Sequence, residues 1–205
     1  MEQNKEMTAQ ESLAVITETM NNSRKEIVRR CGKHFLLWGS LLLFFSLLVF
    51  ILWKVTGHAQ WNLLWFAMPV AGFPLAHFLD RKKDADLPDN ALSRVLKGIW
   101  LTYCAFAVSV AAFTMVYVSV NPNPIGTIVL GAGLTAQLVL LFGMAETISG
   151  VALRERPITL AGFLTGIGGL AIYYLLDLGA EQMLIFTFAG IVLALTGVII
   201  KNRNR

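Results

Sequence analysis

Long apolar runs alternate with short polar segments along most of the chain. Residues 98–145 contain no Asp, Glu, Lys or Arg, and a helix of that length would be more than twice as long as the hydrocarbon core of a bilayer is thick. The run must therefore turn back. We place the turn at Asn121-Pro122-Asn123-Pro124, because each proline removes a backbone donor and disfavours helix in the residue before it.

The same pattern predicts six membrane-spanning helices. The runs are uniformly apolar rather than alternating, which argues against the strands of a membrane β-barrel. Each has the length of about twenty residues that a helix needs to cross the hydrocarbon core. The predicted spans are 35–53, 61–79, 98–120, 125–145, 157–176 and 182–200, in a transmembrane domain of residues 34–200. We expect an all-α polytopic membrane protein whose spans form three consecutive helical hairpins.

Composition supports lipid as the solvent for most of the chain. The sequence is 56% hydrophobic and 15% charged, compared with roughly 45–50% and about 25% in soluble domains. A soluble protein of this size would lack the polar groups needed to cover its surface. The chain is therefore expected to be an integral membrane protein.

The placement of the basic residues predicts the orientation. Sixteen of the 17 Lys and Arg residues fall in the N-terminal segment, the second and fourth loops and the tail 201–205, and the opposite side has Lys54 alone. By the positive-inside rule both termini are cytoplasmic. These residues are expected to face anionic lipid headgroups, so the net charge of +4 does not indicate a nucleic-acid partner.

Residues 1–33 are predicted to form a separate cytoplasmic amphipathic helix. Thr8 and Glu11 have the spacing of a capping box at its start, and the cluster 21–23 is a candidate break. Apolar residues recur at helical intervals. They form a stripe of Leu13, Ile16, Met20 and Ile27. The helix either lies on the inner leaflet or docks to a cytosolic protein or a second copy of the chain.

This N-terminal pattern resembles a group of small, uncharacterised bacterial inner-membrane proteins. The residues that carry the resemblance are Glu11-Ser12-Leu13, Ile16, Met20 and Leu37-Trp38-Gly39. In that group a short amphipathic cytoplasmic helix precedes a span that begins Leu-Trp-Gly. The resemblance covers about the first forty residues. It implies a six-span protein of the bacterial inner (plasma) membrane and transfers no catalytic or binding residue.

Two polar residues, one within the predicted fourth span and one directly after it, are candidate functional groups, because polar side chains are costly in hydrocarbon. Glu146 is flanked by apolar sequence on both sides. We expect it to form an ion pair with Arg154 or Arg156 at the cytoplasmic interface, with a proton- or cation-coupling carboxylate as the alternative. Gln137 is expected to form a hydrogen bond between helices.

The second span contains Pro69, Gly72 and Pro74, which predict a kinked or locally unwound helix. Broken helices form ion sites in some transporters, although prolines in membrane helices also have structural roles. His77 follows, with Asp80 and Asp84 at helical spacing. We interpret these three as a solvated cytoplasmic end, with a weak metal or proton site as the alternative.

Small residues predict close helix packing in the last two spans. They are Gly162 and Gly166 in the fifth span and Gly190 and Ala194 in the sixth. Small residues let two helix backbones approach closely. This contact matters in a membrane, because lipid gives no hydrophobic driving force for helix association. We expect these two spans to pack against each other through them, with dimerisation through the same residues as the alternative.

No catalytic motif, paired intramembrane carboxylates or metal-spaced Cys and His set is visible, and the two cysteines, Cys31 and Cys104, lie in different environments. No cofactor or metal is therefore expected. We predict a non-enzymatic membrane scaffold or regulator that acts through its N-terminal helix. The alternative is a small-solute or ion transporter or channel that uses the second span, Gln137 and Glu146. A membrane enzyme is the least favoured class.

Overall fold

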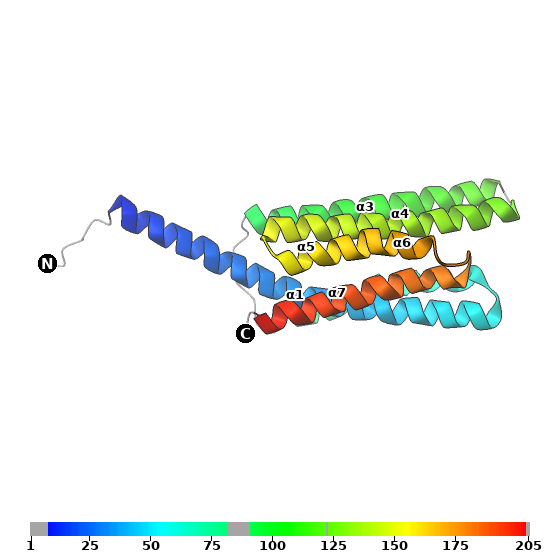
Figure 1. The fold of residues 1–205 in the computed structure, drawn as a ribbon, viewed down its shortest axis with the longest axis horizontal. Helices are drawn as coiled ribbons and strands as arrows, with labels where there is room; N and C mark the ends of the chain where they lie inside the picture. Colours follow the sequence, from blue (N-terminus) through cyan, green and yellow to red (C-terminus); the bar gives the residue numbers. More distant parts are fainter. Residues whose placement is uncertain (1–7, 82–90, 122, 204–205) are drawn as a thin grey trace.

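The computed structural model describes residues 8–81, 91–121 and 123–203, and all regular structure in these ranges is helical. Figure 1 shows the order of the elements. They are α1 (Ala9–Thr56), η1 (Ala59–Phe66), α2 (Ala67–Arg81), α3 (Ala91–Val120), α4 (Pro124–Leu153), α5 (Arg156–Phe163), η2 (Leu164–Gly168), α6 (Gly169–Tyr173), η3 (Ala180–Gln182) and α7 (Met183–Arg203). The segments η1 and η3 are 3₁₀ helices, and η2 is a π-helical turn.

Five helices of the described residues are long and apolar enough to cross a membrane. They are Ala9–Thr56, Ala59–Asp80, Ala91–Val120, Gly133–Leu153 and Ala180–Arg203. The predicted span 157–176 is helical from Arg156 to Tyr173, but the π-helical turn η2 divides it into short pieces. The all-α class and its membrane-length helices are confirmed, and the number of six spans stays a prediction.

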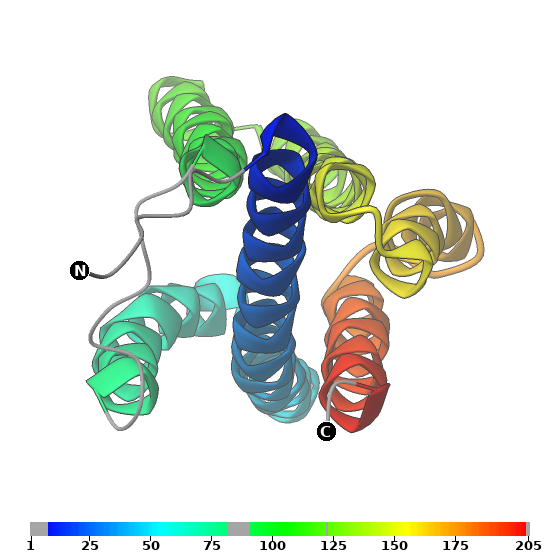
Figure 2. The same cartoon turned by 90° about the vertical axis from the view of Figure 1, so that its left-hand side faces the viewer.

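Helix α1 lies at the centre of the bundle. Figure 2 looks along the bundle and shows α1 in the middle, with α2, α3, α4, α5 and α7 around it. Val28, Phe35, Leu42 and Val49 of α1 are buried at seven-residue intervals, the repeat that keeps one face of a helix against its neighbours. Val28 and Phe35 belong to a core cluster that also contains residues of four other helices. These are Leu96, Leu153, Ile158, Leu193 and Ile200.

The packing of α1 against α7 depends on small residues. A Cβ atom on Gly39 would lie 2.5 Å from the backbone nitrogen of Ala194, and one on Gly190 would lie 2.7 Å from that of Leu43. Farther along the same contact, the Ser46 and Thr187 hydroxyl oxygens are 2.9 Å apart and hydrogen-bonded. The two helices therefore touch backbone to backbone.

Helix α4 makes the same kind of contact with α5 and η2. A Cβ atom on Gly143 would overlap the backbone of Gly166, and one on Gly162 would overlap the backbone of Thr147. The expected contact of the fifth and sixth spans through Gly162, Gly166, Gly190 and Ala194 is therefore wrong. Gly162 and Gly166 pack on α4, whereas Gly190 and Ala194 pack on α1. Small residues indicate that a backbone can be approached closely, but not which helix approaches it.

The N-terminal segment does not form the separate helix that we expected. Thr8 caps α1: its backbone nitrogen donates to Glu11 Oε2 at 2.8 Å, and the Glu11 nitrogen donates to Thr8 Oγ1 at 3.3 Å, so the capping box is confirmed. The helix then continues without a break through residues 21–23 to Thr56. Asn and Ser each cost a helix less than about 0.7 kcal/mol relative to Ala, which is too little to end it. We refer to residues 9–26, which extend beyond the bundle in Figure 1, as the arm.

Candidate functional site

The arm carries an apolar stripe that nothing in the described chain covers. The exposed fractions are 65% for Leu13, 55% for Ile16 and 68% for Met20. Ile27, predicted to belong to the same stripe, is only 6% exposed and lies in the bundle core, so its assignment to a partner or membrane surface is wrong. The stripe available to another molecule is therefore Leu13, Ile16 and Met20.

Charged side chains hold the base of the arm against α2. His34 Nε2 lies 3.1 Å from Asp80 Oδ1, and Arg30 Nε lies 3.5 Å from the same oxygen. On α1 itself, Arg29 forms two contacts with Glu26, at 2.9 Å and 2.6 Å. These groups are partly exposed, so each pair stabilises only modestly. The two contacts with Asp80 join this part of α1 to α2.

The predicted cluster of His77, Asp80 and Asp84 is not assembled as one site. His77 is exposed and forms no hydrogen bond with a described residue, Asp80 is bound to α1, and Asp84 lies outside the described residues. Sequence reasoning missed His34 as the partner of Asp80 because the two residues are far apart in the chain.

The proline segment of the second span is helical. Helix α2 includes both Pro69 and Pro74, and the irregular 3₁₀ part of the span, η1, ends at Phe66, before either proline. The predicted unwinding between the prolines is therefore wrong. A Cβ atom on Gly72 would lie 2.6 Å from the Trp38 ring, and Trp38 packs edge to face on Phe73 with ring centroids 5.5 Å apart. Gly72 thus provides space for an aromatic side chain of α1.

Glu146 is the most unusual polar group in the bundle. Its side chain is 0% exposed, and neither carboxyl oxygen has a hydrogen-bond partner in the described chain. The expected ion pair with Arg154 or Arg156 is therefore wrong. Helix α4 continues to Leu153, beyond the end that we predicted at 145, so Glu146 lies about two turns inside its helix.

Gln137 and Glu146 do not share a cavity. The Gln137 side chain is exposed and forms no hydrogen bond to any residue that the structure describes, so the predicted interhelical bond is wrong. The surface hollow at the end of α3 and the one along the arm do not reach Gln137 or the segment 69–74.

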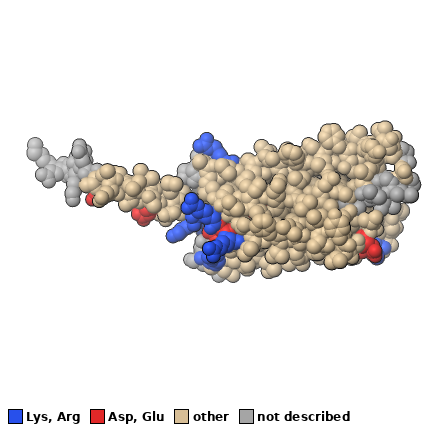
Figure 3. Space-filling view, turned by 45° about the horizontal axis from the view of Figure 1, so that its top comes forward, with Lys and Arg blue, Asp and Glu red and all other residues tan. Residues whose placement is uncertain are grey.

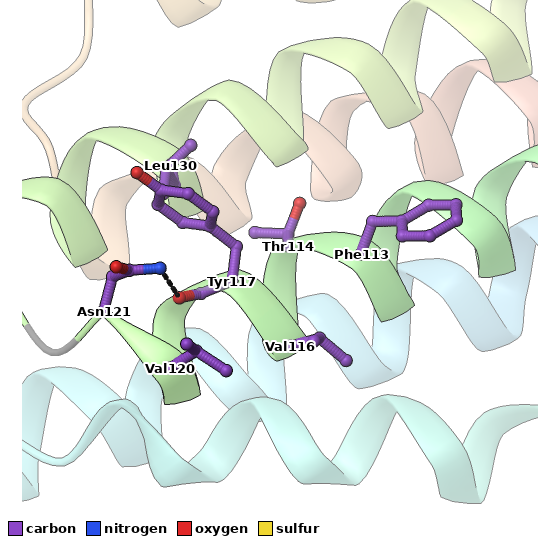
Figure 4. Close-up of a pocket in the computed structure, with 7 residues that line it drawn as sticks. All are labelled: Phe113, Thr114, Val116, Tyr117, Val120, Asn121 and Leu130. Carbon is purple, nitrogen blue, oxygen red and sulfur yellow. Dashed lines mark hydrogen bonds between the residues drawn. The ribbon is translucent and has the colours of Figure 1, made fainter.

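The hollow at the end of α3 is shallow and mainly apolar. Figure 4 shows Phe113, Val116, Tyr117 and Val120 along one side of α3, with Asn121 Nδ2 donating to the Tyr117 carbonyl oxygen at 3.3 Å. It brings together no acid, base or nucleophile with the geometry of a catalytic site. We assign it no chemistry.

The charges gather at the ends of the bundle. Figure 3 shows Lys and Arg at the end from which the arm extends, and a long surface without charged side chains between the two ends. At the opposite end Lys54 of α1 is paired with Glu181 of η3. This distribution is typical of a protein whose middle crosses a bilayer.

Comparison with known proteins adds no relative: no family model, no curated protein and no solved structure matches the chain. The resemblance of the N-terminal pattern to small bacterial inner-membrane proteins therefore stays a prediction.

Proposed function

We propose that the protein is a membrane-anchored, non-enzymatic scaffold or regulator whose arm docks a helical segment of a cytosolic protein. The observation that carries this proposal is the exposed stripe of Leu13, Ile16 and Met20 on a helix that continues directly into the membrane domain. Large apolar side chains clustered on an otherwise polar surface often mark an interaction site.

The proposed setting is the bacterial inner membrane, with six spans and both termini in the cytoplasm. The concentration of basic residues at the arm end supports this orientation. The sixth crossing would be the helical segment from Arg156 to Tyr173, through α5, η2 and α6. With this orientation the arm extends into the cytosol, and its basic base lies near anionic headgroups.

A helix is the partner that the stripe fits. Leu13, Ile16 and Met20 are separated by three and then four residues, the spacing with which side chains interlock between two helices. The arm base is fixed in the bundle core, because Val28 is buried there and Asp80 binds the next turn. A partner bound to the stripe is therefore held at a defined distance from the membrane.

Photo-crosslinking in cells tests this proposal. A photoreactive amino acid at Ile16 should give one discrete adduct with a cytosolic protein. The matched control is Val15, which is 52% exposed and lies about 100° around the helix from Ile16, outside the stripe. Equal adducts from both positions would contradict a specific docking face. Adducts with a second copy or with lipid alone would contradict the choice of a cytosolic partner.

A triple replacement of the stripe distinguishes docking from folding. Leu13→Ala, Ile16→Ala and Met20→Ala together remove apolar bulk while retaining good helix formers. Because Ile16 is replaced in this variant, the photoreactive amino acid is placed at the neighbouring Thr17. We expect normal membrane insertion and loss of the adduct that the same position gives with an intact stripe. Retention of that adduct would contradict the proposal.

Transport of a small cation is the second candidate function, and the buried Glu146 carboxyl is the observation that favours it. The other residues predicted for a transport path do not support it, since Gln137 is exposed and the Pro69–Pro74 segment is helical. Counterflow of a labelled cation in proteoliposomes, compared with Glu146→Gln, tests this alternative.

A further inference from the structure

Glu146 and Thr165 are two buried polar side chains without a partner, and they lie beside each other. Both are 0% exposed, and the Thr165 hydroxyl is the side-chain group that faces the Glu146 carboxyl. Neither the carboxyl oxygens nor the hydroxyl oxygen has a hydrogen bond within the described chain. Buried polar groups are nearly always paired, so two adjacent exceptions require an explanation.

Thr165 differs from the other hydroxyl residues around it. Thr147, Ser149 and Thr196 each donate to the backbone carbonyl four residues earlier, at 2.8 Å. Thr165 lies in the π-helical turn η2 and makes no such bond. Turns of this kind inside α-helices are frequent at functional sites. The Thr165 hydroxyl is therefore free to serve as an oxygen ligand.

Glycine contacts close the site against lipid. Gly143 and Gly150, which precede and follow Glu146 by about one turn, touch the backbone of η2 and α5. On the opposite side Gly162 and Gly166 touch α4, and Thr165 lies between them in sequence. Glu146 and Thr165 are thus on the facing surfaces of two helices whose backbones are in contact.

The chemistry of the site indicates its occupant. An ionised carboxylate without a partner is very costly in a medium of low dielectric constant, so a positive charge must accompany it. No charged side chain of the described residues pairs with the Glu146 carboxyl, whose two oxygens have no partner there. The described chain also has no group of three His, Cys, Asp or Glu residues that could hold a metal ion, and one carboxylate balances only one positive charge.

We propose that Glu146 and Thr165 form a binding site for one small monovalent cation, a proton or Na⁺. A bound proton makes the carboxyl a neutral donor to the Thr165 hydroxyl oxygen. A bound Na⁺ would take the carboxylate and the hydroxyl as oxygen ligands. This site is independent of the proposed docking by the arm, because its residues lie on α4 and η2.

Thermal unfolding of the purified full-length protein in lipid nanodiscs tests the site. A cation that binds only the folded state raises the unfolding temperature as its concentration increases. We expect such a rise for the wild type, either on acidification or when Na⁺ replaces choline at constant pH, and no rise for Glu146→Gln. The same dependence on pH and on Na⁺ in both proteins would overturn the proposal.

Labelling with dicyclohexylcarbodiimide, an apolar reagent that reacts with protonated carboxylic acids, identifies the ion. If a proton is the ligand, Glu146 labelling measured by peptide mass spectrometry should fall about tenfold per pH unit above its midpoint, because one proton is lost. If Na⁺ is the ligand, adding it at constant pH should protect Glu146. Labelling that is absent throughout, or that responds to neither ion, overturns the proposal.

Thr165→Val tests the hydroxyl ligand with little change in shape. We expect it to shift the midpoint of Glu146 labelling or to abolish protection by Na⁺. Thr196→Val, which removes a buried hydroxyl on α7 that already has a backbone partner, is the matched control and should leave both unchanged. Identical labelling in the Thr165→Val variant and the control would exclude Thr165 from the site.

Discussion

At the scale of single residues, glycine determines how closely the helices of this bundle approach. Gly39 and Gly190 allow α1 and α7 to touch, and Gly143 and Gly162 do the same for α4 and α5. The hydroxyls of Ser46 and Thr187 continue the first contact and pair with each other. Lipid provides no hydrophobic force that drives helices together, so the van der Waals contact between these closely packed backbones stabilises the bundle.

Replacing Gly39 should therefore be far more harmful than replacing an unconstrained glycine. In Gly39→Ala the new methyl group meets the Ala194 backbone, and overpacking of this kind typically costs about 1–3 kcal/mol. Gly98→Ala on α3 has nothing within 4 Å and is expected to be neutral or stabilising, because Ala favours helix over Gly by up to about 1 kcal/mol. Thermal unfolding in detergent compares the two variants. Equal unfolding temperatures would contradict the close contact of α1 with α7.

At the scale of elements, α1 combines two parts that its sequence pattern led us to separate. The change from polar to apolar residues near position 33 is a change of surroundings, from solvent to bilayer, and does not require a change in backbone. In the span 157–176 the backbone changes while the hydropathy does not. Its uniformly apolar sequence gives no sign of the π-helical turn at Leu164–Gly168. Backbone continuity is set by capping and tertiary contacts, which hydropathy does not report.

The start of α1 should depend on pH through its cap. Hydrogen bonds from Thr8 hold the pKa of Glu11 below its ordinary value. The cap's contribution is therefore complete above the ordinary pKa of a glutamate and is lost as the pH falls through the lowered value. We expect the first turn to fray on acidification, seen as faster amide exchange at Ser12, whose nitrogen donates to the Thr8 carbonyl oxygen.

The Glu11→Gln variant keeps the shape of the cap and removes its charge. In this variant the amide exchange rate at Ser12, corrected for the intrinsic effect of pH, should no longer change on acidification. Glu18→Gln serves as the matched control, because Glu18 takes no part in the cap. A wild-type profile that follows the Glu11→Gln profile at every pH would contradict a charged cap.

At the scale of the whole molecule, hydropathy and charge predicted much of the architecture. The helical class and the membrane-length helices agree with the structure, and α3 ends at Val120, next to the turn predicted to begin at Asn121. The pairing of helices could not be predicted, because apolar segments are alike in composition and a glycine pattern does not show which helix packs against it.

The candidate site was found only in part. Glu146 stood out as an acid in an apolar run, whereas Thr165 did not, since hydroxyl residues are common in membrane helices. The sequence signal for Thr165 was its position three residues after Gly162, on the same face of the helix.

At this scale the protein is a helical bundle from which one long helix extends as the arm (Figure 1). Because Val28 and Phe35 are buried in the core and Asp80 binds His34, the arm direction follows from the bundle. Helix α1 runs without a break from the arm into a segment of membrane length. We therefore expect the arm to extend from the membrane, and the inner-leaflet position stays the alternative.

The distance between spin labels at Glu18 and Ile51 tests this claim most directly. Both side chains are exposed in α1, and Cys31 and Cys104 would first be replaced by Ala so that only the two labels react. Pulsed electron paramagnetic resonance in lipid nanodiscs should give one distribution centred near about 50 Å, the length of a continuous helix between these positions. A distribution centred near about 40 Å, as expected for a helix bent at a right angle near residue 27 so that it lies on the membrane, would contradict the account.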